Sequence, residues 1–289
     1  MSPVSGCVLR HHRGAAAHHR EDGVSVVDNN SNDGTAELVK SRPGVRWLPQ
    51  DRNVGFARAN NVGLATAEAQ LVLFLNPDTV VGPGVLDAST ERIRSDARVA
   101  IVGCRLADCS GVADPNGKRT FPSLRAAASR LSGWGRIVGP SEYHTPSMSD
   151  NECGPVDAVS GAFMMVRKDL IDQVGGFDEG YWMYGEDLDL CQRARTAGYL
   201  TWYEGGVTTQ HVGGGAAGVV RRAKLTVAFH HAMARYYRLY YSGERPWLDV
   251  AVYCAIGVRL ILALAANEVR RGWLSLSPPS SHAATDIRG

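Results

Sequence analysis

The stretch VSVVDNNSNDGT, Val24–Thr35, decides the fold, because it joins a Val-rich run to a polar turn. A short apolar run bounded by Asp, Asn and Ser is typical of a buried strand that ends in a turn. The turn leads into SNDGTAELVKSR, in which an Asn or Asp is available to cap a helix. The stretch therefore predicts a strand, a turn and a helix in succession.

The same alternation continues toward the C-terminus. Apolar runs predict strands, segments opened by Gly or Pro predict helices, and a polar tripeptide, Asn76–Asp78, breaks the most apolar run. Such alternation favours an α/β fold with a mostly parallel sheet flanked by helices. The pattern is lost over residues 108–151, which we interpret as a loop-rich excursion over the sheet. The predicted elements lie within residues 45–49, 53–67, 71–81, 83–96, 99–106, 156–179, 181–199 and 201–210.

The remaining boundaries come from composition. The His- and Arg-rich start, residues 1–22, has no apolar core of signal-peptide length and predicts a disordered leader. Residues 23–218 form the predicted α/β domain, residues 219–272 predict a C-terminal helical region, and residues 273–289 predict a disordered tail.

Within the C-terminal region, Trp247–Ala266 is about one bilayer in length. Asp249 and Arg259 interrupt it, and an Arg at mid-span is costly in hydrocarbon. We therefore expect a helix that lies on a membrane or packs on the protein rather than a span. The basic, Tyr-rich segment 221–245 leaves two alternatives open: peripheral contact with an anionic membrane, or a solvated helix face.

Net charge and cysteine spacing limit which partners and which cellular compartment can be predicted. The net charge of +2 gives no general argument for binding nucleic acid, and no such partner is predicted. The six cysteines form no CxxC pair and no zinc-type spacing. Scattered cysteines in a chain of this length are typical of reduced thiols. We predict a cytoplasmic protein, with the inner face of the cell membrane as an alternative location.

Polar groups follow several of the predicted elements. Asp28 and Asp78 follow apolar strands, Glu186-Asp187 stands at a predicted helix start, and His211 follows a predicted strand. Ligands of open α/β sheets bind beyond the carboxyl ends of the strands. We therefore expect these side chains to converge, although each acid taken alone also fits a helix cap.

A calcium loop is the first alternative for the opening stretch. With Asp28 as position 1, Asn30 and Asn32 fit positions 3 and 5 of an EF-hand loop. Asp33 stands where Gly is required, and Val39 stands where the bidentate Glu is required, so the calcium interpretation fails. A plain turn with a helix cap remains as the second alternative for this segment.

Five motifs occur in a fixed order: VVDNNSNDGTAEL, NVGFARANNVGL, LFLNPDTVV, SGAFMMVRKDLIDQVGGFDEGYWMYGEDLDLCQRARTAGY and a strand that ends in His. In this order they resemble glycosyltransferase family 2, whose members are inverting enzymes with the GT-A fold. The resemblance is greatest to its bacterial rhamnosyltransferase-like branch, and it covers about residues 24–215.

The resemblance implies a nucleotide site and a metal. Asp28 would accept a hydrogen bond from the imide N–H of uracil or thymine, because a carboxylate is an acceptor-only group. Asp78 matches the family's metal-binding DxD aspartate, Asn76 replaces the first Asp of that motif, and His211 resembles the histidine that completes the site. A divalent cation, Mg²⁺ or Mn²⁺, would neutralise the departing diphosphate.

The segment around Asn53, Gly55 and Asn60 would line the nucleotide, with Gly55 allowing close approach and the two Asn residues fixing the loop.

The resemblance also implies an acceptor side. Asp187 matches the family's catalytic base, which takes the proton from an acceptor hydroxyl as that oxygen attacks the anomeric carbon. Glu186 would hold the acceptor or a donor hydroxyl, and Asp189 would orient its neighbours. Trp182 and Tyr184 would supply an aromatic platform for the acceptor sugar.

The sequence departs from the family at its start. Members usually carry a strand and a helix before the VVD strand, and no matching run is found before Val24. Loss of that β–α unit would expose the VSVV strand and remove one wall of the base site. Either the start is divergent or the chain lacks this unit, and the His-, Arg- and Ala-rich composition favours the second alternative.

Three hypotheses remain open. The first is an active, metal-dependent inverting sugar transferase that uses dTDP-rhamnose or a UDP-sugar. Its acceptor would be a saccharide or a polyprenyl-diphosphate-linked glycolipid in cell-wall or surface polysaccharide synthesis. The second is a truncated, non-catalytic relative that binds nucleotide or a partner only. The third is a non-enzymatic calcium- or carbohydrate-binding module, which the calcium-loop mismatch and the Glu186-Asp187 segment disfavour.

Overall fold

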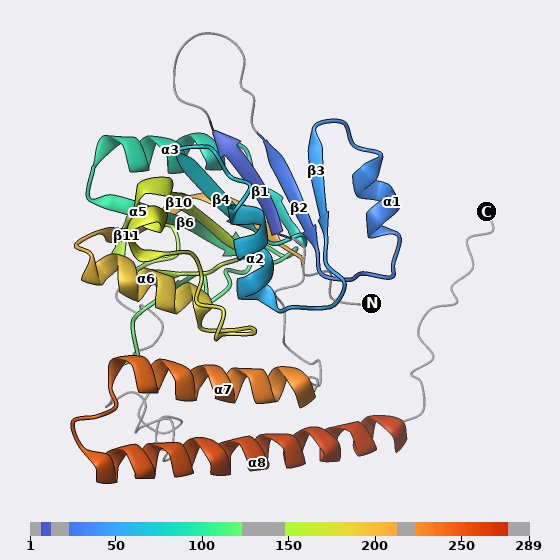
Figure 1. Ribbon diagram of the computed structural model, residues 1–289, viewed down its shortest axis with the longest axis vertical. Helices are drawn as coiled ribbons and strands as arrows, with labels where there is room; N and C mark the ends of the chain where they lie inside the picture. The colour runs from blue at the N-terminus through green and yellow to red at the C-terminus, as the bar shows by residue number, and fades with distance from the viewer. Residues whose placement is uncertain (1–6, 13–22, 123–147, 213–222, 277–289) are drawn as a thin grey trace, which may run out of the picture.

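The computed structural model describes residues 7–12, 23–122, 148–212 and 223–276 (Figure 1). The strands are β1 (Cys7–His12), β2 (Val24–Asp28), β3 (Val45–Pro49), β4 (Leu71–Leu75), β5 (Thr79–Val81), β6 (Val99–Ala107), β7 (Lys118–Arg119), β8 (Gly154–Val156), β9 (Ala158–Val159), β10 (Phe163–Arg167) and β11 (Leu200–His211). The helices are α1 (Thr35–Lys40), α2 (Phe56–Leu64), α3 (Val85–Ser95), α5 (Lys168–Val174), α6 (Glu186–Thr196), α7 (Ala223–Tyr240) and α8 (Pro246–Leu276).

The main sheet has the strand order β3-β2-β1-β4-β10-β6-β11-β5, with β8 paired to β11. Only the pairs β2–β3 and β6–β11 are parallel, so the sheet is mixed and not mostly parallel as predicted. β1 is antiparallel to both β2 and β4, and β10 is antiparallel to both β4 and β6. It follows that β2, β3, β4, β6 and β11 all point the same way, with reversed strands inserted between them.

The expectation of a disordered leader before Val24 is wrong for Cys7–His12. This segment forms β1 and fills the position between β2 and β4, so β2 is paired on both sides and is not exposed at an edge. Parallel pairing of consecutive strands needs a crossover of about a dozen or more residues that usually contains a helix. Only residues 13–23 separate β1 from β2, which accounts for the reversed direction of β1. The rest of the predicted leader, residues 1–6 and 13–22, lies outside the described residues.

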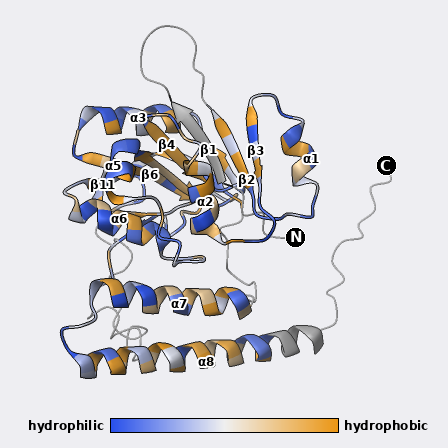
Figure 2. Cartoon of the chain, viewed as in Figure 1, coloured by the Kyte–Doolittle hydropathy of each residue, from blue (hydrophilic) through white to orange (hydrophobic). Residues whose placement is uncertain are grey.

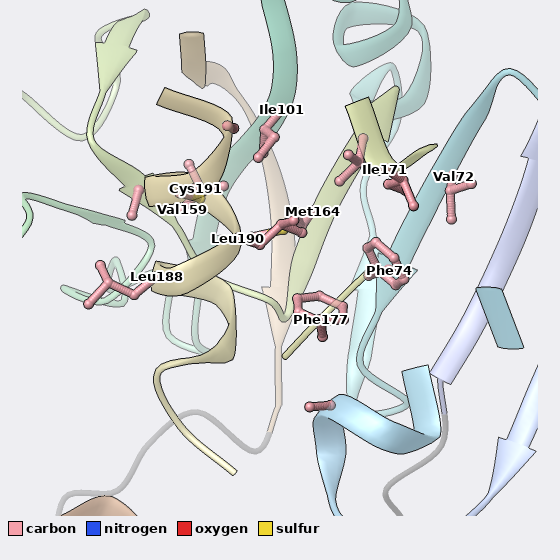
Figure 3. Close-up of a cluster of buried hydrophobic side chains, with 14 of the residues drawn as sticks. Val72, Phe74, Ile101, Val159, Met164, Ile171, Phe177, Leu188, Leu190 and Cys191 are labelled. Atoms are coloured by element: carbon pink, nitrogen blue, oxygen red, sulfur yellow. The ribbon is translucent and has the colours of Figure 1, made fainter. Parts of the chain in front are cut away.

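The two faces of the sheet are covered separately. Successive side chains of a strand point to opposite faces, so a strand that is buried on both faces reads as a continuous apolar run. In β4, Val72 and Phe74 belong to the core beneath α6, where Phe74 packs edge-to-face on Phe177 at 4.7 Å between ring centroids (Figure 3). Leu71 and Leu73 face the other way and pack with Val85 and Ile93 of α3 (Figure 1).

The predicted loop over residues 108–151 contains one element that the sequence does not indicate. β7 pairs with β9 as a separate two-stranded sheet and carries Arg119 into the interior. Residues 123–147 of this loop lie outside the described residues.

Two helices follow the α/β region. α7 lies beneath it, and α8 lies beneath α7 as the outermost layer (Figure 1). α8 includes the predicted helix at Trp247–Ala266 and continues to Leu276, beyond the predicted start of the tail at residue 273. Its segment Pro246–Arg270 is long and apolar enough to cross a membrane by length and composition. Apolar residues recur along the coloured part of the helix, interrupted by polar ones (Figure 2).

Candidate active site

The carboxyl ends of the strands that share one direction lie along one edge of the sheet. β2 ends at Asp28, β4 is followed by Asn76–Asp78, and β11 ends at His211. Open α/β sheets gather their ligand-binding groups at such an edge. The fold thus places three of the predicted residues where a ligand can meet them.

Asp78 and His211 are brought into contact. β5 pairs with β11 so that Thr79 lies opposite His211, which carries the turn after β4 to the end of β11. The backbone N–H of Val212 donates to the carbonyl oxygen of Asp78 at 2.8 Å. As a result Oδ1 of Asp78 is 3.3 Å from Nε2 of His211.

Another acid, Asp114, lies on the other side of the His211 ring from Asp78. The sequence analysis missed it. Its Oδ2 is 3.7 Å from Nδ1 of His211, which is close enough for an ion pair but too long for a hydrogen bond. Asp114 and then Asp78 raise the pKa of His211 to about 9. In return His211 lowers the pKa of Asp78. Burial opposes ionisation of Asp114, but His211 and Asn116 outweigh it and keep its pKa below the ordinary value.

These residues fit a divalent cation. Two neighbouring oxygen or nitrogen ligands of a small cation, each at about 2.1 Å, are about 3 Å apart, close to the 3.3 Å between Asp78 and His211. A carboxylate behind the other ring nitrogen is the usual device for orienting a metal-binding imidazole, which places Asp114 in that role. Among the described residues no group of three or more His, Cys, Asp and Glu could hold a metal ion, so substrate and water oxygens would have to complete the shell.

The end of β2, where the nucleotide is predicted to bind, is organised by Asn29, another residue that the sequence analysis missed. Asp28 is buried and accepts a hydrogen bond from the backbone N–H of Ser31 at 2.9 Å. Asn29 accepts from the N–H of Val54 at 2.8 Å and donates to the carbonyl of Gly55 at 3.2 Å. Asn53 accepts from the N–H of Gly55 at 3.0 Å. The side chain of Asn29 therefore fixes the loop before α2 to the end of β2, and Asn53 braces the loop from within.

Gly55 has a structural reason to be Gly beyond the approach of a nucleotide. Its φ of 92° lies in a region that L side chains rarely adopt, and a Cβ there would lie 2.4 Å from the carbonyl oxygen of Trp182. That carbonyl accepts a hydrogen bond from the N–H of Phe56 at 2.7 Å. The missing side chain thus lets the Trp182 segment dock on the start of α2.

Asn60 is not brought to the nucleotide side. It is buried, and its amide donates to the carbonyl of Phe56 within the same helix at 2.9 Å. Its neighbour Asn61 makes the long-range contacts, donating to the carbonyl of Phe177 at 2.8 Å and accepting from the N–H of Phe177 at 2.9 Å. The prediction that Asn60 fixes the loop before α2 is therefore wrong.

Asp187 lies in the first turn of α6 and is held on both of its oxygens. Oδ2 accepts from Nη2 of Arg119 at 2.6 Å and from the N–H of Gly161 at 3.0 Å. Oδ1 accepts from the N–H of Leu188 at 2.7 Å. The guanidinium also donates to the carbonyl of Val159 at 2.9 Å. Arg119, which the sequence analysis missed, therefore pairs a buried cation with the predicted catalytic base.

Glu186 is buried beside Asp187 without an equivalent partner. Its Oε2 has no hydrogen-bond partner in the structure. Burial raises the pKa of Glu186 well above its ordinary value, and the charge of Asp187 adds to the rise. A carboxyl group of this kind is neutral over a wider pH range and can donate a hydrogen bond.

The predicted aromatic platform lies against α7. Nζ of Lys224 is 4.0 Å from the ring centroid of Trp182, and Tyr184 packs edge-to-face on Phe229 at 5.8 Å. Tyr184 also has a φ of 72°, a backbone conformation that is uncommon outside Gly and concentrates at functional sites. Both aromatic residues thus belong to the interface between the α6 segment and the C-terminal helices.

Asp189 connects α6 to α7. It accepts from Nε of Arg193 at 2.8 Å and from the hydroxyl of Tyr240 at 2.7 Å. The prediction that Asp189 orients its neighbours agrees with these two contacts, although its neighbour on α7 was not foreseen.

A short backbone path links the two sides of the site. The N–H of Asn76 donates to the carbonyl of Ala162 at 3.0 Å, and the preceding residue, Gly161, donates to Asp187. A Cβ on Gly161 would lie 3.3 Å from the ring of Phe56, so this segment also touches the start of α2. The turn that carries Asp78 and the carboxylate of Asp187 are therefore held in register by residues 161–162.

Two family models match the chain. The model described as glycosyl transferase family 2 matches residues 10–175, and a model described as the N-terminal domain of galactosyltransferase matches residues 151–211. The first match begins within β1, and the second contains Asp187 and His211.

Two curated relatives are 30–33% identical to the chain over the aligned residues. The N-acetylglucosaminyl-diphospho-decaprenol L-rhamnosyltransferase of Mycobacterium tuberculosis is 33% identical over 201 residues, which cover 65% of this chain and 65% of the relative. Rhamnosyltransferase WbbL of Escherichia coli is 30% identical over 156 residues, which cover 52% of this chain and 57% of the relative. The chain thus matches less than two thirds of the length of either relative.

Solved structures show the same fold at low identity. GalNAc-T7 with UDP, GalNAc and Mn²⁺ gives a TM-score of 0.53 at 14% identity, covering 76% of this chain and 42% of the other. The mannosyltransferase PcManGT from Pyrobaculum calidifontis with GDP-Man and Mn²⁺ gives a TM-score of 0.50 at 16% identity. That match covers 89% of this chain and 67% of the other. These likenesses confirm the predicted GT-A fold.

Proposed function

Because this chain belongs to glycosyl transferase family 2, we propose that it moves a sugar from a nucleoside-diphosphate donor to a saccharide acceptor with inversion at the anomeric carbon. The observation that carries the proposal is the backbone path from Asn76 through residues 161–162 to Asp187. This path fixes Asp78 and His211, the pair that would face the diphosphate, relative to the buried carboxylate of Asp187. A transferase needs this arrangement, because its leaving group and its base act on opposite faces of one carbon.

The donor side would hold the nucleoside diphosphate. Asp28 would accept from the imide N–H of the base, at the end of the strand that Asn29 ties to the loop before α2. Asp78 and His211 would hold a divalent cation, which when bound neutralises charge on the departing diphosphate. A protonated His211 cannot ligate, so binding of the cation would displace its proton.

The acceptor side would hold the base. An ionised carboxylate has about four lone-pair sites on its two oxygens. Arg119 and Gly161 occupy both lone-pair sites on Oδ2 of Asp187, and the N–H of Leu188 occupies one of the two on Oδ1. The second site on Oδ1 is left for a substrate hydroxyl. In the reaction the acceptor oxygen bonds to the anomeric carbon, its proton moves to Oδ1, and the bond from that carbon to the diphosphate oxygen breaks.

Arg119 and Glu186 would set the state of this base. The guanidinium holds the carboxylate of Asp187 in a fixed orientation before the acceptor arrives. The buried, neutral Glu186 would offer a hydrogen-bond donor beside it, in keeping with its assigned role of holding a sugar hydroxyl. Trp182 and Tyr184 would stack on the acceptor sugar.

The relatives favour a donor and an acceptor class. Both named relatives are rhamnosyltransferases, and one acts on an N-acetylglucosaminyl-diphospho-decaprenol. We extend these classes to this chain: dTDP-rhamnose as the first donor, UDP-hexoses as the next, and a polyprenyl-diphosphate-linked sugar of cell-wall or surface polysaccharide synthesis as the acceptor. Such an acceptor places the enzyme at the cytoplasmic face of the cell membrane.

A non-catalytic relative is the second candidate, and one observation favours it. β1 runs opposite to its neighbours at the centre of the donor side of the sheet, so a nucleotide site built beside it could retain binding without turnover.

One experiment separates the two candidates. The full chain is mixed with dTDP-rhamnose or UDP-sugars, Mn²⁺ and a short-chain polyprenyl-diphospho-sugar, and release of nucleoside diphosphate is followed. The proposed function predicts release that depends on both the acceptor and the metal. Tight binding of nucleotide with no release from any donor would support the non-catalytic candidate instead.

A further inference from the structure

α8 presents an apolar face to the outside of the molecule. Between Trp247 and Asn267 the chain has only two charged residues, Asp249 and Arg259, and neither is among the exposed positions. The exposed positions recur every three or four residues, so they form one stripe along the helix. The large side chains of this α8 outer face are Trp247, Val250, Val258, Ile261, Leu262 and Val269, each 57–70% exposed.

The polar groups of α8 are turned toward the protein. Asp249 accepts from the hydroxyl of Tyr237 at 2.7 Å and from the N–H of Gly243 at 3.0 Å. Near the other end, Nδ2 of Asn267 donates to Oγ1 of Thr226 at 3.0 Å. A helix on a soluble surface normally buries its apolar stripe and exposes its polar side. α8 buries Ile256 but also exposes an apolar stripe, and this outer face is suited to a hydrocarbon environment.

The way α8 is held excludes a crossing of the membrane in this fold. Its contacts with Tyr237 and Thr226 lie far apart on α7, so the two helices lie side by side along most of their lengths (Figure 1). α7 is fixed to the α/β region, because Arg235 donates to Asp178 from Nε at 2.8 Å and from Nη2 at 2.7 Å. A spanning α8 would carry the charges of α7 into hydrocarbon, which is costly. Only the outer face of α8 can therefore reach a bilayer.

We propose that the α8 outer face lies in the plane of an anionic lipid bilayer. From Trp247 to Val269 the stripe is about 33 Å long, at 1.5 Å per residue. Exposed charges of both signs flank it, with the cations in excess: Arg238, Glu244 and Arg245 stand near its start, and Glu268 and Arg270 stand near its end. Trp247 opens the stripe, and Trp is enriched at the level of lipid headgroups. This combination of an apolar stripe, an excess of flanking cations and a terminal Trp matches a lipid surface better than a second copy of the chain.

The bilayer contact would lie next to the acceptor side of the site. α7 packs on α8 below and carries Lys224 and Phe229 against Trp182 and Tyr184 above. The inference rests on the proposed function only for the identity of the acceptor, since binding to lipid is measured without donor or turnover. A membrane-lying α8 would present the acceptor-side aromatic residues to a lipid-linked sugar.

The test is flotation of the full chain with vesicles of phosphatidylcholine containing phosphatidylglycerol. The variant Ile261→Glu with Leu262→Glu places two charges in the outer face. Its matched control is Leu38→Glu with Val112→Glu, which changes the net charge equally at two sites of similar exposure far from α8. We expect the partition coefficient of the α8 variant to fall at least about tenfold, while the control retains that of the wild type.

A second variant, Ile261→Lys with Leu262→Lys, separates burial of apolar surface from attraction of charge. Apolar docking predicts that this variant also binds less than the wild type, whereas purely electrostatic attraction would make it bind more. Equal binding by the wild type and both α8 variants overturns the proposal. A wild-type dimer in solution that becomes a monomer in both α8 variants, with unchanged vesicle binding, would assign the face to a second copy and would also overturn it.

Discussion

The two sides of the candidate site hold their carboxylates in opposite ways. On the donor side the side chain of Asp78 is 44% exposed and faces one imidazole. On the acceptor side the side chain of Asp187 is 12% exposed and meets a guanidinium and two backbone N–H groups. The oxygens of Asp78 are therefore accessible to the cation and diphosphate that we propose. Asp187 is held by protein groups before any acceptor binds, at the cost of burying charge.

This contrast predicts how substitutions on each side affect stability and binding. A buried ion pair is costly to break, because the remaining partner stays charged and unpaired in the interior. The half-exposed carboxylate of Asp78 is more screened by solvent and contributes less to folding. Substitution of Asp187 or Arg119 should disturb both chemistry and stability, whereas substitution of Asp78 should disturb mainly binding.

The largest expected effect is on turnover by Asp187→Asn. The amide keeps the size of the side chain but cannot take a proton, and loss of a general base typically costs about 10²–10⁴-fold in rate. Release of nucleoside diphosphate in the presence of acceptor measures this effect. A variant that keeps wild-type turnover would show that another group takes the proton.

The next largest effect is on stability, for Arg119→Met. This change leaves Asp187 buried without its cation, which should lower the free energy of unfolding by on the order of 3–5 kcal/mol. Denaturant unfolding measures it, and adding Asp187→Asn to the same chain should recover part of the loss. The matched control is Arg98→Met, which removes an exposed pair with Asp96 and should leave the midpoint unchanged. An equal loss of unfolding free energy in Arg119→Met and Arg98→Met would contradict the claim that Arg119 stabilises the fold by pairing with the buried Asp187.

A smaller effect is expected for Glu186→Gln, as a change in the pH dependence of stability. The folded pKa of Glu186 lies above its ordinary value of 4.5. Its contribution to stability is therefore fully present below that value and is lost as pH rises toward the folded pKa, by no more than about 1.4 kcal/mol per pH unit. Gln cannot ionise, so the variant should gain stability relative to wild type as pH rises from about 5 to about 8.

Thermal unfolding across this pH range checks the change, with the exposed Glu91→Gln as the control. Parallel profiles for the wild type and Glu186→Gln would show that Glu186 is not held neutral.

The sequence predicts the strands of the site well, because apolar runs that end in acids identify buried strands and their carboxyl ends. It predicts the meeting of Asp78 and His211 through the resemblance, and β5 explains it physically by pairing with β11. The direction of β1 is not encoded in its composition and follows from the short link before β2. Cys7–His12 is a strand because it pairs with β2 on one side and β4 on the other, which its His- and Arg-rich composition does not indicate.

The missed residues lie where local patterns carry no signal. Arg119 and Asp114 stand in an aperiodic segment, and only long-range packing brings them to Asp187 and His211. Asn29 stands in a run of polar residues in which any member could have held the loop before α2. Gly55 was singled out for the approach of a nucleotide, but the neighbour that requires a Gly there is Trp182, which lies more than a hundred positions away in the sequence.

The division of the site into an open donor side and a preformed acceptor side is tested most directly by calorimetric titration of a nucleoside diphosphate with Mn²⁺. The account predicts that Asp187→Asn binds as tightly as the wild type, and that Asp78→Asn binds at least about tenfold more weakly. Weakened binding in Asp187→Asn together with wild-type binding in Asp78→Asn would contradict it.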